Sequence, residues 1–207
     1  MNSRATTMVA LGLAGVTAGV YALARPAGPA DGGALPPAAV GPPSAAVGAP
    51  APSPPSEIRG ARGLRAVVVP VAAGRDGALA LPEDARTGGW WALGAMAGAA
   101  EGTTLIAGHV DTRGSGPGAF AALHGLAPGA RVELVAANGL TYPYVIAARR
   151  LYDRQALPAE LFGRSGAHRL ALVTCAGNYD PDKRAYDANL VLYATPLGGP
   201  LRPRGES

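Results

Sequence analysis

The sequence predicts an all-β domain, either a β-barrel or a β-sandwich, of about seven or eight short strands. Short runs of β-branched and apolar residues recur from Leu64 onward, with turn signals between them. One is a strong hairpin signal, because Asn138-Gly139 lies between two such runs. Strands are expected at 66–71, 79–81, 104–107, 131–135, 141–148, 169–174 and 189–195, and one or two short helices at 119–126 and 158–162.

Residues 1–25 are predicted to form a membrane anchor. Arg4 precedes an apolar run from Met8 to Ala24, and Arg25 closes it. The run is near the lower end of the roughly 17–25 residues that cross a bilayer, and it exceeds the usual core of a signal peptide. The alternative is a signal peptide cleaved after Ala24. Both interpretations place the rest of the chain outside the cytoplasm.

The remaining chain divides by composition into three parts. Residues 26–57 are almost wholly Pro, Ala, Gly, Ser and Val, which is typical of a linker. Residues 58–197 are enough for one hydrophobic core and too few for two domains. Residues 198–207 are expected to be a disordered tail.

The composition argues against several classes of protein. The net charge of +4 is modest and the arginines are scattered, so we expect no nucleic-acid partner. The single cysteine cannot form an internal disulfide. The sequence contains no cluster of metal-ligand residues, so neither a metal nor another cofactor is expected.

The only cysteine, Cys175, ends the apolar run 170–174 and is followed by turn residues from Ala176 onward. This pattern predicts a buried strand with a nucleophilic thiol at its tip. The competing interpretation is an inert buried cysteine, because free cysteines usually behave as small hydrophobic residues.

A histidine in a matching position favours the nucleophile. His109 follows the apolar run 104–107, so two expected strands end in a histidine and a cysteine. A thiol with a pKa near ~8.5 is only a few per cent ionised at neutral pH, and an adjacent imidazole would activate it. Asp111 either orients this imidazole or serves a turn. His124 and His168 lack a strand-end setting and are expected at the surface.

These motifs resemble one enzyme family. The histidine stands in Gly108-His109-Val110-Asp111 and the cysteine in Leu172-Val173-Thr174-Cys175, an order similar to that of the sortases, the cysteine transpeptidases of Gram-positive cell surfaces. With Gly89-Trp90-Trp91 and Gly116-Pro117-Gly118-Ala119-Phe120, the sequence is similar to the class F sortases of actinobacteria. The resemblance covers about residues 65–196, nearly all of the expected folded domain.

The resemblance implies a closed, seven- to eight-stranded sortase-like barrel over residues 58–197. It also implies that Cys175 attacks the carbonyl after Thr in an LPxTG-like sorting signal, giving a thioacyl enzyme. An amine of a peptidoglycan precursor would resolve this intermediate, with His109 as general acid and base. The implied protein is a monomer held at the cell membrane, with its catalytic domain outside the cytoplasm.

The expected third catalytic residue is where the sequence departs from this family. In class F sortases an arginine that stabilises the oxyanion lies in a Tyr-Arg-Asp-Asn stretch. The corresponding residues here are Tyr186-Asp187-Ala188-Asn189, and a carboxylate cannot perform that role. Arg184, two residues before Tyr186, is the candidate substitute. Arg149, Arg150 and Arg154 are further candidates.

Three alternative functions remain open from the sequence. One is a hydrolase on the same scaffold, in which water resolves the thioacyl enzyme. Another is a catalytically impaired homologue that still binds sorting signals. A third is another cell-wall cysteine enzyme, but NlpC/P60 peptidases place Cys before His, and the His-x-x-x-Cys neighbourhood of L,D-transpeptidases is absent here.

Overall fold

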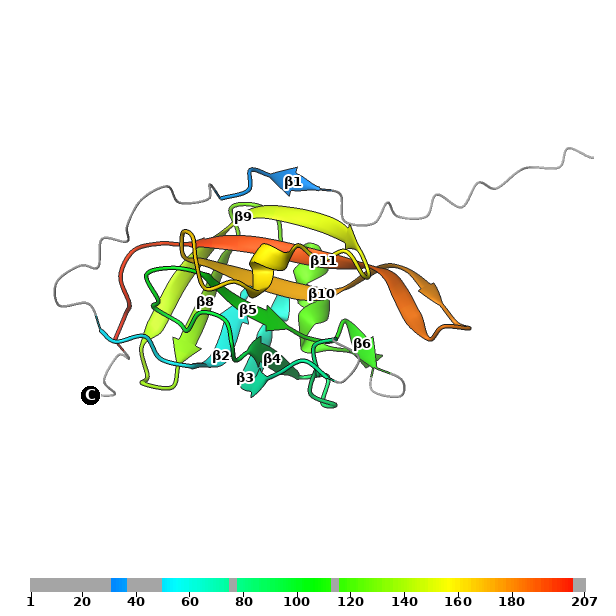
Figure 1. Ribbon diagram of the computed structural model, residues 1–207, viewed down its shortest axis with the longest axis horizontal. Coiled ribbons are helices and arrows are strands. Elements are labelled where there is room, and N and C mark those ends of the chain that lie inside the picture. The colour runs from blue at the N-terminus through cyan, green and yellow to red at the C-terminus, as the bar shows by residue number, and fades with distance from the viewer. Residues whose placement is uncertain (1–30, 37–49, 75–77, 113–115, 203–207) are drawn as a thin grey trace, which may run out of the picture.

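The computed structural model describes residues 31–36, 50–74, 78–112 and 116–202, and it confirms the predicted all-β fold (Figure 1). The two predicted helical segments both form short 3₁₀-helices, η2 and η3. The elements in chain order are β1 (Gly32–Gly33), β2 (Pro55–Gly60), η1 (Ala61–Gly63), β3 (Arg65–Val71), β4 (Thr87–Trp91), β5 (Thr103–Ala107), β6 (Asp111–Thr112), β7 (Gly116–Pro117), η2 (Ala119–Gly125), β8 (Arg131–Ala136), β9 (Thr141–Asp153), η3 (Ala159–Phe162), β10 (Arg169–Asp180) and β11 (Ala185–Pro196).

The main sheet closes on itself as a barrel. Neighbouring strands follow the order β9-β11-β10-β5-β4-β3-β2-β8, and β8 pairs back with β9, so eight strands form the closure. The β3–β4 and β5–β10 pairs are parallel. The predicted hairpin is the β8–β9 connection, in which Val135 pairs with Thr141 and Gly139 adopts a φ of 79°.

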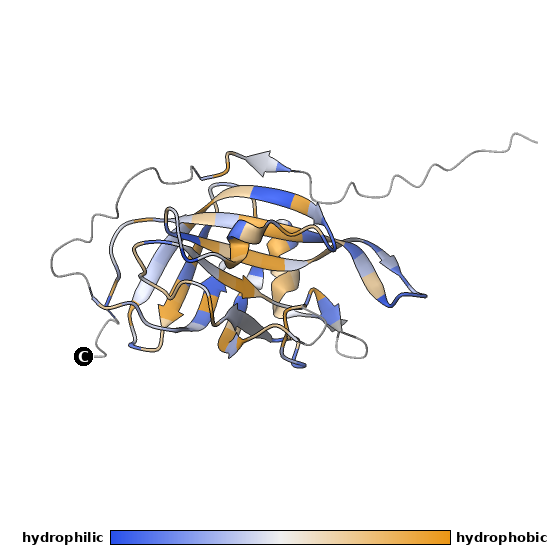
Figure 2. Cartoon of the chain, in the orientation of Figure 1, coloured by the Kyte–Doolittle hydropathy of each residue, from blue (hydrophilic) through white to orange (hydrophobic). Residues whose placement is uncertain are grey.

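Residues 170–174 of strand β10 are buried on both faces, which explains the apolar run there. Leu170 and Leu172 point into the barrel and join the larger core cluster with Phe120 of η2. Ala171 and Val173 point the other way and pack in a second cluster that includes Leu161 of η3. Figure 2 shows the apolar colouring of β5 and the middle of β10 giving way to hydrophilic residues in the protruding β10–β11 hairpin.

Two strands of the barrel, β2 and β4, were not predicted from the sequence, and one predicted strand is absent. The prediction at 79–81 is wrong, because only Leu79 pairs, in an isolated bridge with Ala73. Strand β4 contains Gly88 and Gly89, which have low strand propensity. A Cβ at Gly88 would lie 3.0 Å from the Phe120 ring, and one at Gly89 would lie 2.9 Å from Val71. Close packing therefore requires glycine in this strand.

Part of the predicted linker forms a strand on the outside of the barrel. We refer to residues 31–36 as the amino-terminal strap, whose strand β1 pairs with Ala148 and Arg149 of β9. Leu151 N donates to Asp31 Oδ1 at 2.8 Å. Arg150 donates from Nη1 to the Gly32 carbonyl at 2.7 Å and from Nη2 to the Gly33 carbonyl at 2.9 Å. Figure 1 shows β1 lying along β9, and together these contacts fix the strap to the barrel.

The two ends of the chain are described only in part. The predicted anchor, residues 1–25, lies outside the described residues, and within the described ranges no helix is long and apolar enough to span a bilayer. In the predicted tail, Leu201 exchanges two backbone hydrogen bonds with Thr141, at 2.7 and 2.9 Å. The first part of that tail is therefore attached to the barrel.

Candidate active site

Cys175 lies inside a long strand rather than at its tip, which corrects the sequence interpretation. Strand β10 pairs with β5 only as far as Val173, opposite Ala107. Its pairing with β11 continues through Cys175, opposite Asn189, and on to Asp180. At Cys175 the sheet has therefore lost β5, while on the other side β11 still pairs with β9 at Asn189. One edge of β10 opens to the site at this point.

The cysteine side chain faces out of the barrel. Because side chains alternate along a strand, Cys175 shares a face with Ala171 and Val173. It is half-buried. On this face lies a cavity of about 750 Å³, here called the apolar cavity, whose wall is largely aliphatic and aromatic. Its lining includes Leu79, Leu81, Leu105, Leu157, Phe162, Val173 and Cys175.

His109 follows β5 and is held next to the cysteine strand. Gly108 N donates to the Val173 carbonyl at 3.0 Å, and Thr174 Oγ1 donates to the Gly108 carbonyl at 2.9 Å. His109 Nε2 lies 2.9 Å from the Pro82 carbonyl. A carbonyl can only accept, so Nε2 carries the proton and Nδ1 is left able to accept one.

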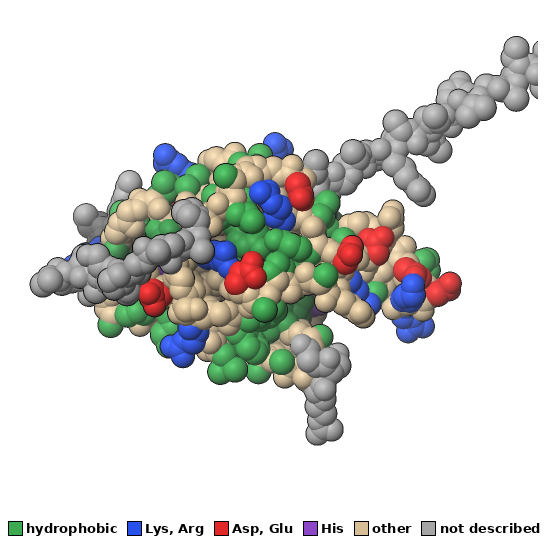
Figure 3. Space-filling model, turned by 45° about the horizontal axis from the view of Figure 1, so that its top comes forward, with side chains coloured by type: hydrophobic (Ala, Val, Ile, Leu, Met, Phe, Trp, Pro, Cys, Tyr) green, Lys and Arg blue, Asp and Glu red, His purple; other side chains and the backbone are tan. Residues whose placement is uncertain are grey.

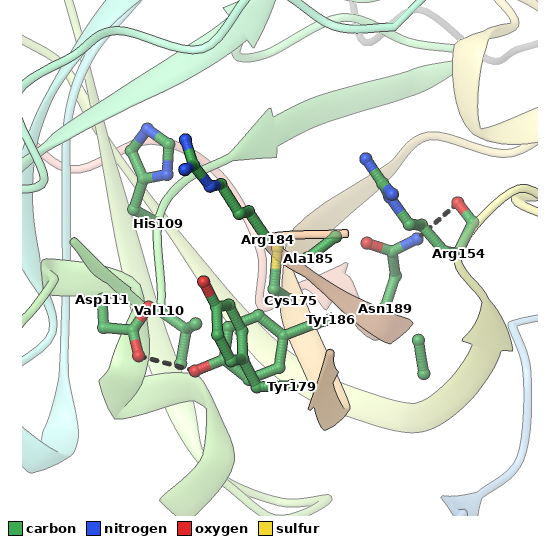
Figure 4. Close-up of a pocket in the computed structure, with 11 residues that line it drawn as sticks. His109, Val110, Asp111, Arg154, Cys175, Tyr179, Arg184, Ala185, Tyr186 and Asn189 are labelled. Atoms are coloured by element: carbon green, nitrogen blue, oxygen red, sulfur yellow. Dashed lines mark hydrogen bonds between the residues drawn. The ribbon is translucent and has the colours of Figure 1, made fainter. Parts of the chain in front are cut away.

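Histidine, cysteine and two arginines meet at a second cavity, of about 380 Å³, here called the polar cavity (Figure 4). His109, Cys175, Arg154 and Arg184 all line it, and Figure 4 shows their side chains around it. Cys175 lines both cavities. The structure thus brings the predicted residues His109, Cys175 and Arg184 together with Arg154, one of the three further candidate arginines.

The four candidate arginines separate into two groups. Arg149 donates to the Leu126 carbonyl at 2.9 Å, and Arg150 holds the strap, so both act away from the thiol. Arg154 follows β9 and lines both cavities. Its backbone is fixed, because its N–H donates to the Asp187 carbonyl at 2.9 Å and its carbonyl accepts from Asn189 Nδ2 at 3.0 Å.

Arg184 occupies a different setting, on the exposed turn that ends the β10–β11 hairpin. Its φ of 53° lies in the left-handed region, which is uncommon for residues other than glycine. Such conformations cluster at functional sites. Figure 3 shows acidic and basic side chains gathered at the end of this hairpin.

The cysteine is a neutral thiol in the resting site. Burial raises the pKa of Cys175 above its ordinary value, the charge of Arg154 partly offsets this, and Asp111 adds a further rise. At neutral pH only a small fraction of the Cys175 side chain is therefore ionised before substrate binds. Attack by such a thiol needs a base to take its proton, and His109 lines the same cavity.

Asp111 contacts the β10–β11 hairpin. Its Oδ2 accepts from the Tyr186 hydroxyl at 2.6 Å. This hydrogen bond raises the pKa of Tyr186 to about 12. The ring of Tyr186 also packs edge-on against Tyr179, with centroids 5.3 Å apart. Asp111 therefore joins the histidine loop to the β10–β11 hairpin.

Asp187, where the resemblance to class F sortases led us to expect an arginine, forms hydrogen bonds within the hairpin. Its carboxylate accepts from Asn178 N at 2.8 Å and from Asn178 Nδ2 at 3.1 Å. These bonds stabilise a β-bulge at Gly177, whose φ is 82° and whose Cβ, if present, would overlap the Asp187 carboxylate. The bulge continues the β10–β11 ladder past Cys175, where the sequence predicts a strand end.

We expect Asp187→Arg to damage the hairpin rather than restore a catalytic group. The exposed hydrogen bonds lost should cost about 1 kcal/mol of unfolding free energy, or about 2–4 °C in Tm. Hydrogen exchange measured by mass spectrometry should accelerate within residues 177–186 while the barrel strands keep their protection. Lys183→Arg, which adds no charge to the same hairpin, is the control. Higher transfer activity in Asp187→Arg would contradict this assignment.

Two histidines expected at the surface are instead half-buried and bonded. His168 Nε2 lies 2.9 Å from the Tyr144 hydroxyl, and burial lowers the pKa of His168. His124, on η2, places Nε2 3.0 Å from the carbonyl oxygen of Cys175. Sequence reasoning missed His124 because the contact joins residues far apart in the chain. Its short apolar setting contains no signal for the contact.

A closed β-barrel that presents a cysteine, a histidine and arginines to one cavity defines a thiol enzyme of the acyl-transfer class. The sortase domain family matches residues 61–197, and the chain belongs to the sortase family of cysteine transpeptidases. No curated protein matches the sequence.

Solved structures agree with the family at the level of the fold. The SrtA sortase from Actinomyces oris superposes with a TM-score of 0.55 at 16% identity, covering 76% of this chain and 93% of that one. Sortase C1 from Streptococcus agalactiae gives a TM-score of 0.53 at 14% identity, covering 69% and 68%. Sortase C from Streptococcus pneumoniae gives 0.51 at 12%, covering 71% and 69%. At such identities the likeness concerns the barrel alone.

Proposed function

We propose that this chain is a class F sortase of actinobacterial type, held at the cell membrane by residues 1–25, with its catalytic domain outside the cytoplasm. It acts as a monomer, cleaves an LPxTG-like sorting signal after Thr, and transfers the acyl group to an amine of a peptidoglycan precursor. The observation that carries the proposal is the position of Cys175 between an apolar and a polar cavity.

The apolar cavity suits the acyl half of the substrate. A leucine and a proline preceding the scissile bond need a dry, aliphatic surface, which Leu81, Leu105 and Phe162 supply. Binding there places the threonine carbonyl beside the thiol. The nitrogen of the scissile bond, which becomes the leaving amine, then lies toward the polar cavity, which His109 and the two arginines line.

In the acylation step Cys175 Sγ attacks the threonine carbonyl carbon while His109 Nδ1 takes the thiol proton. The carbonyl oxygen gains negative charge, which an arginine stabilises. The electrostatic coupling of Arg154 to Cys175 favours Arg154 for this role, with Arg184 as the second candidate. The C–N bond breaks, His109 returns the proton to the leaving amine, and a thioester remains.

In the transfer step the acceptor amine attacks the thioester carbonyl and gives a proton to His109. The C–S bond breaks, the new amide forms, and His109 returns a proton to the sulfur. The thiol is thereby restored. Water in place of the amine would give hydrolysis by the same sequence of steps.

The test is a product assay with the full-length chain in detergent. An LPxTG peptide and an amine such as triglycine are incubated with the protein, and product masses are followed. We expect the transfer product with amine and slow hydrolysis without it. A peptide with Asp in place of Leu should lose most of its reactivity, because the aliphatic and aromatic side chains of Leu81, Leu105 and Phe162 offer a carboxylate no hydrogen-bond donor.

Two results would count against the proposal. Equal cleavage of the Leu and Asp peptides would remove the role of the apolar cavity. Hydrolysis unchanged by saturating amine would identify a hydrolase instead.

A further inference from the structure

The main-chain carbonyl of the nucleophile is bonded to a histidine that the reaction described above does not use. His124 Nε2 lies 3.0 Å from the Cys175 carbonyl oxygen, so Nε2 carries the proton and donates it. The interaction is partly shielded from solvent. It joins η2 to the strand of the reactive thiol.

The Cys175 carbonyl lacks a backbone donor because the neighbouring strand β5 ends before it reaches Cys175. Backbone groups of residues two apart on a strand point to the same edge, so the carbonyls of Val173 and Cys175 both face the β5 side. The Val173 carbonyl accepts from Gly108 N at 3.0 Å. Strand β5 ends at Ala107, so β5 supplies no N–H for Cys175. The His124 ring takes the place of that missing donor.

His124 is itself held rigidly. Its neighbour Leu123 and the nearby Phe120 and Leu126 are fully buried in the main core cluster. Arg149 Nη1 donates to the Leu126 carbonyl at 2.9 Å, which attaches the end of η2 to β9. A ring carried by a helix that is attached in this way can define the orientation of the peptide group that it contacts.

We propose that His124 is a positioning residue for the nucleophile. Its hydrogen bond fixes the Cys175–Ala176 peptide plane, and through it the direction of the cysteine side chain at the boundary between the two cavities. The proposal rests on the use of Cys175 as the nucleophile. It assigns His124 no contact with substrate and no proton transfer.

The test compares His124→Phe, which removes the donor, with His124→Gln, whose amide nitrogen can replace Nε2. For peptide cleavage we expect His124→Phe to lower kcat roughly 10- to 100-fold with KM little changed, because small misplacements of a reacting group have effects of this size. His124→Gln should recover most of the loss. Unchanged kcat in folded His124→Phe, or no recovery in His124→Gln, would overturn the proposal.

His168→Phe is the matched control. It also removes a half-buried histidine hydrogen bond, but that bond is to the Tyr144 hydroxyl and not to the backbone of Cys175. We expect a lower Tm with kcat retained. If His124→Phe and His168→Phe lose activity in proportion to their Tm values, His124 is merely structural.

A second readout separates this proposal from the proposed function. The chain contains one cysteine, so iodoacetamide labelling measured by mass reports on Cys175 alone. We expect slower labelling in His124→Phe and recovery in His124→Gln, whether or not the protein transfers peptides. Equal labelling rates in the three proteins would overturn the positioning role even if transfer activity is found.

Discussion

Replacing Cys175 by alanine is expected to reduce both transfer and hydrolysis of an LPxTG peptide to background. No other thiol is present to form the thioester, because the chain has a single cysteine. Product mass after incubation with peptide and amine measures the effect. Peptide binding should persist, since the apolar cavity is lined mainly by other residues.

The pH dependence of the thiol provides a further check on this prediction. Because burial raises the pKa of Cys175, iodoacetamide labelling of the wild type should be slow at neutral pH. It should rise with pH and reach its plateau above the range of an ordinary cysteine. Cys175→Ala is the blank for this measurement. Product formation in Cys175→Ala would contradict the assignment of Cys175 as the nucleophile. Fast labelling of the wild type at neutral pH would contradict the raised pKa of its thiol.

Arg154→Ala is expected to lower kcat roughly 100- to 1000-fold, the usual effect of removing one oxyanion donor. The reason is that the Arg154 charge acts on the Cys175 sulfur and that both hydrogen bonds of its backbone hold it at the site. The same substitution should shift the labelling profile of Cys175 to higher pH, because a positive charge that favours the thiolate is lost. Steady-state kinetics and labelling together measure both effects.

Arg184→Ala is the matched comparison, because Arg184 lines the same polar cavity from an exposed turn. We expect a smaller loss of kcat and an unchanged labelling profile. If Arg184→Ala loses more activity than Arg154→Ala, the oxyanion role belongs to Arg184, the candidate indicated by the sequence.

Local patterns made much of the barrel predictable. The Asn138-Gly139 turn between apolar runs and the apolar sequence of β10 depend on residues near one another in the chain, so their signals survive without the fold. Strand β4 gave no such signal, because Gly88 and Gly89 are required by packing against Phe120 and Val71. The partners of these glycines lie far away in the sequence, so the local sequence shows only two residues of low strand propensity.

The residues of the site also divide into those that a local pattern identifies and those that only the fold places there. His109 and Cys175 could be identified because each follows an apolar run. The extension of β10 beyond Cys175 could not, since Gly177 normally indicates a turn and here forms a bulge held by Asp187. Arg154 and His124 reach the site through the pairing of β9 with β11 and the packing of η2, and a sequence pattern contains neither.

The amino-terminal strap limits how far this enzyme can work from the surface to which it is proposed to be anchored. A free linker from residue 25 to residue 58 could extend about 100 Å at about 3.1 Å per residue. With Asp31 bonded to β9, only residues 26–30 separate the anchor from the barrel, and these span about 20 Å at most. The catalytic barrel would then remain close to the lipid headgroups. We therefore expect it to encounter acceptor amines on membrane-bound wall precursors more readily than those in mature, distant wall.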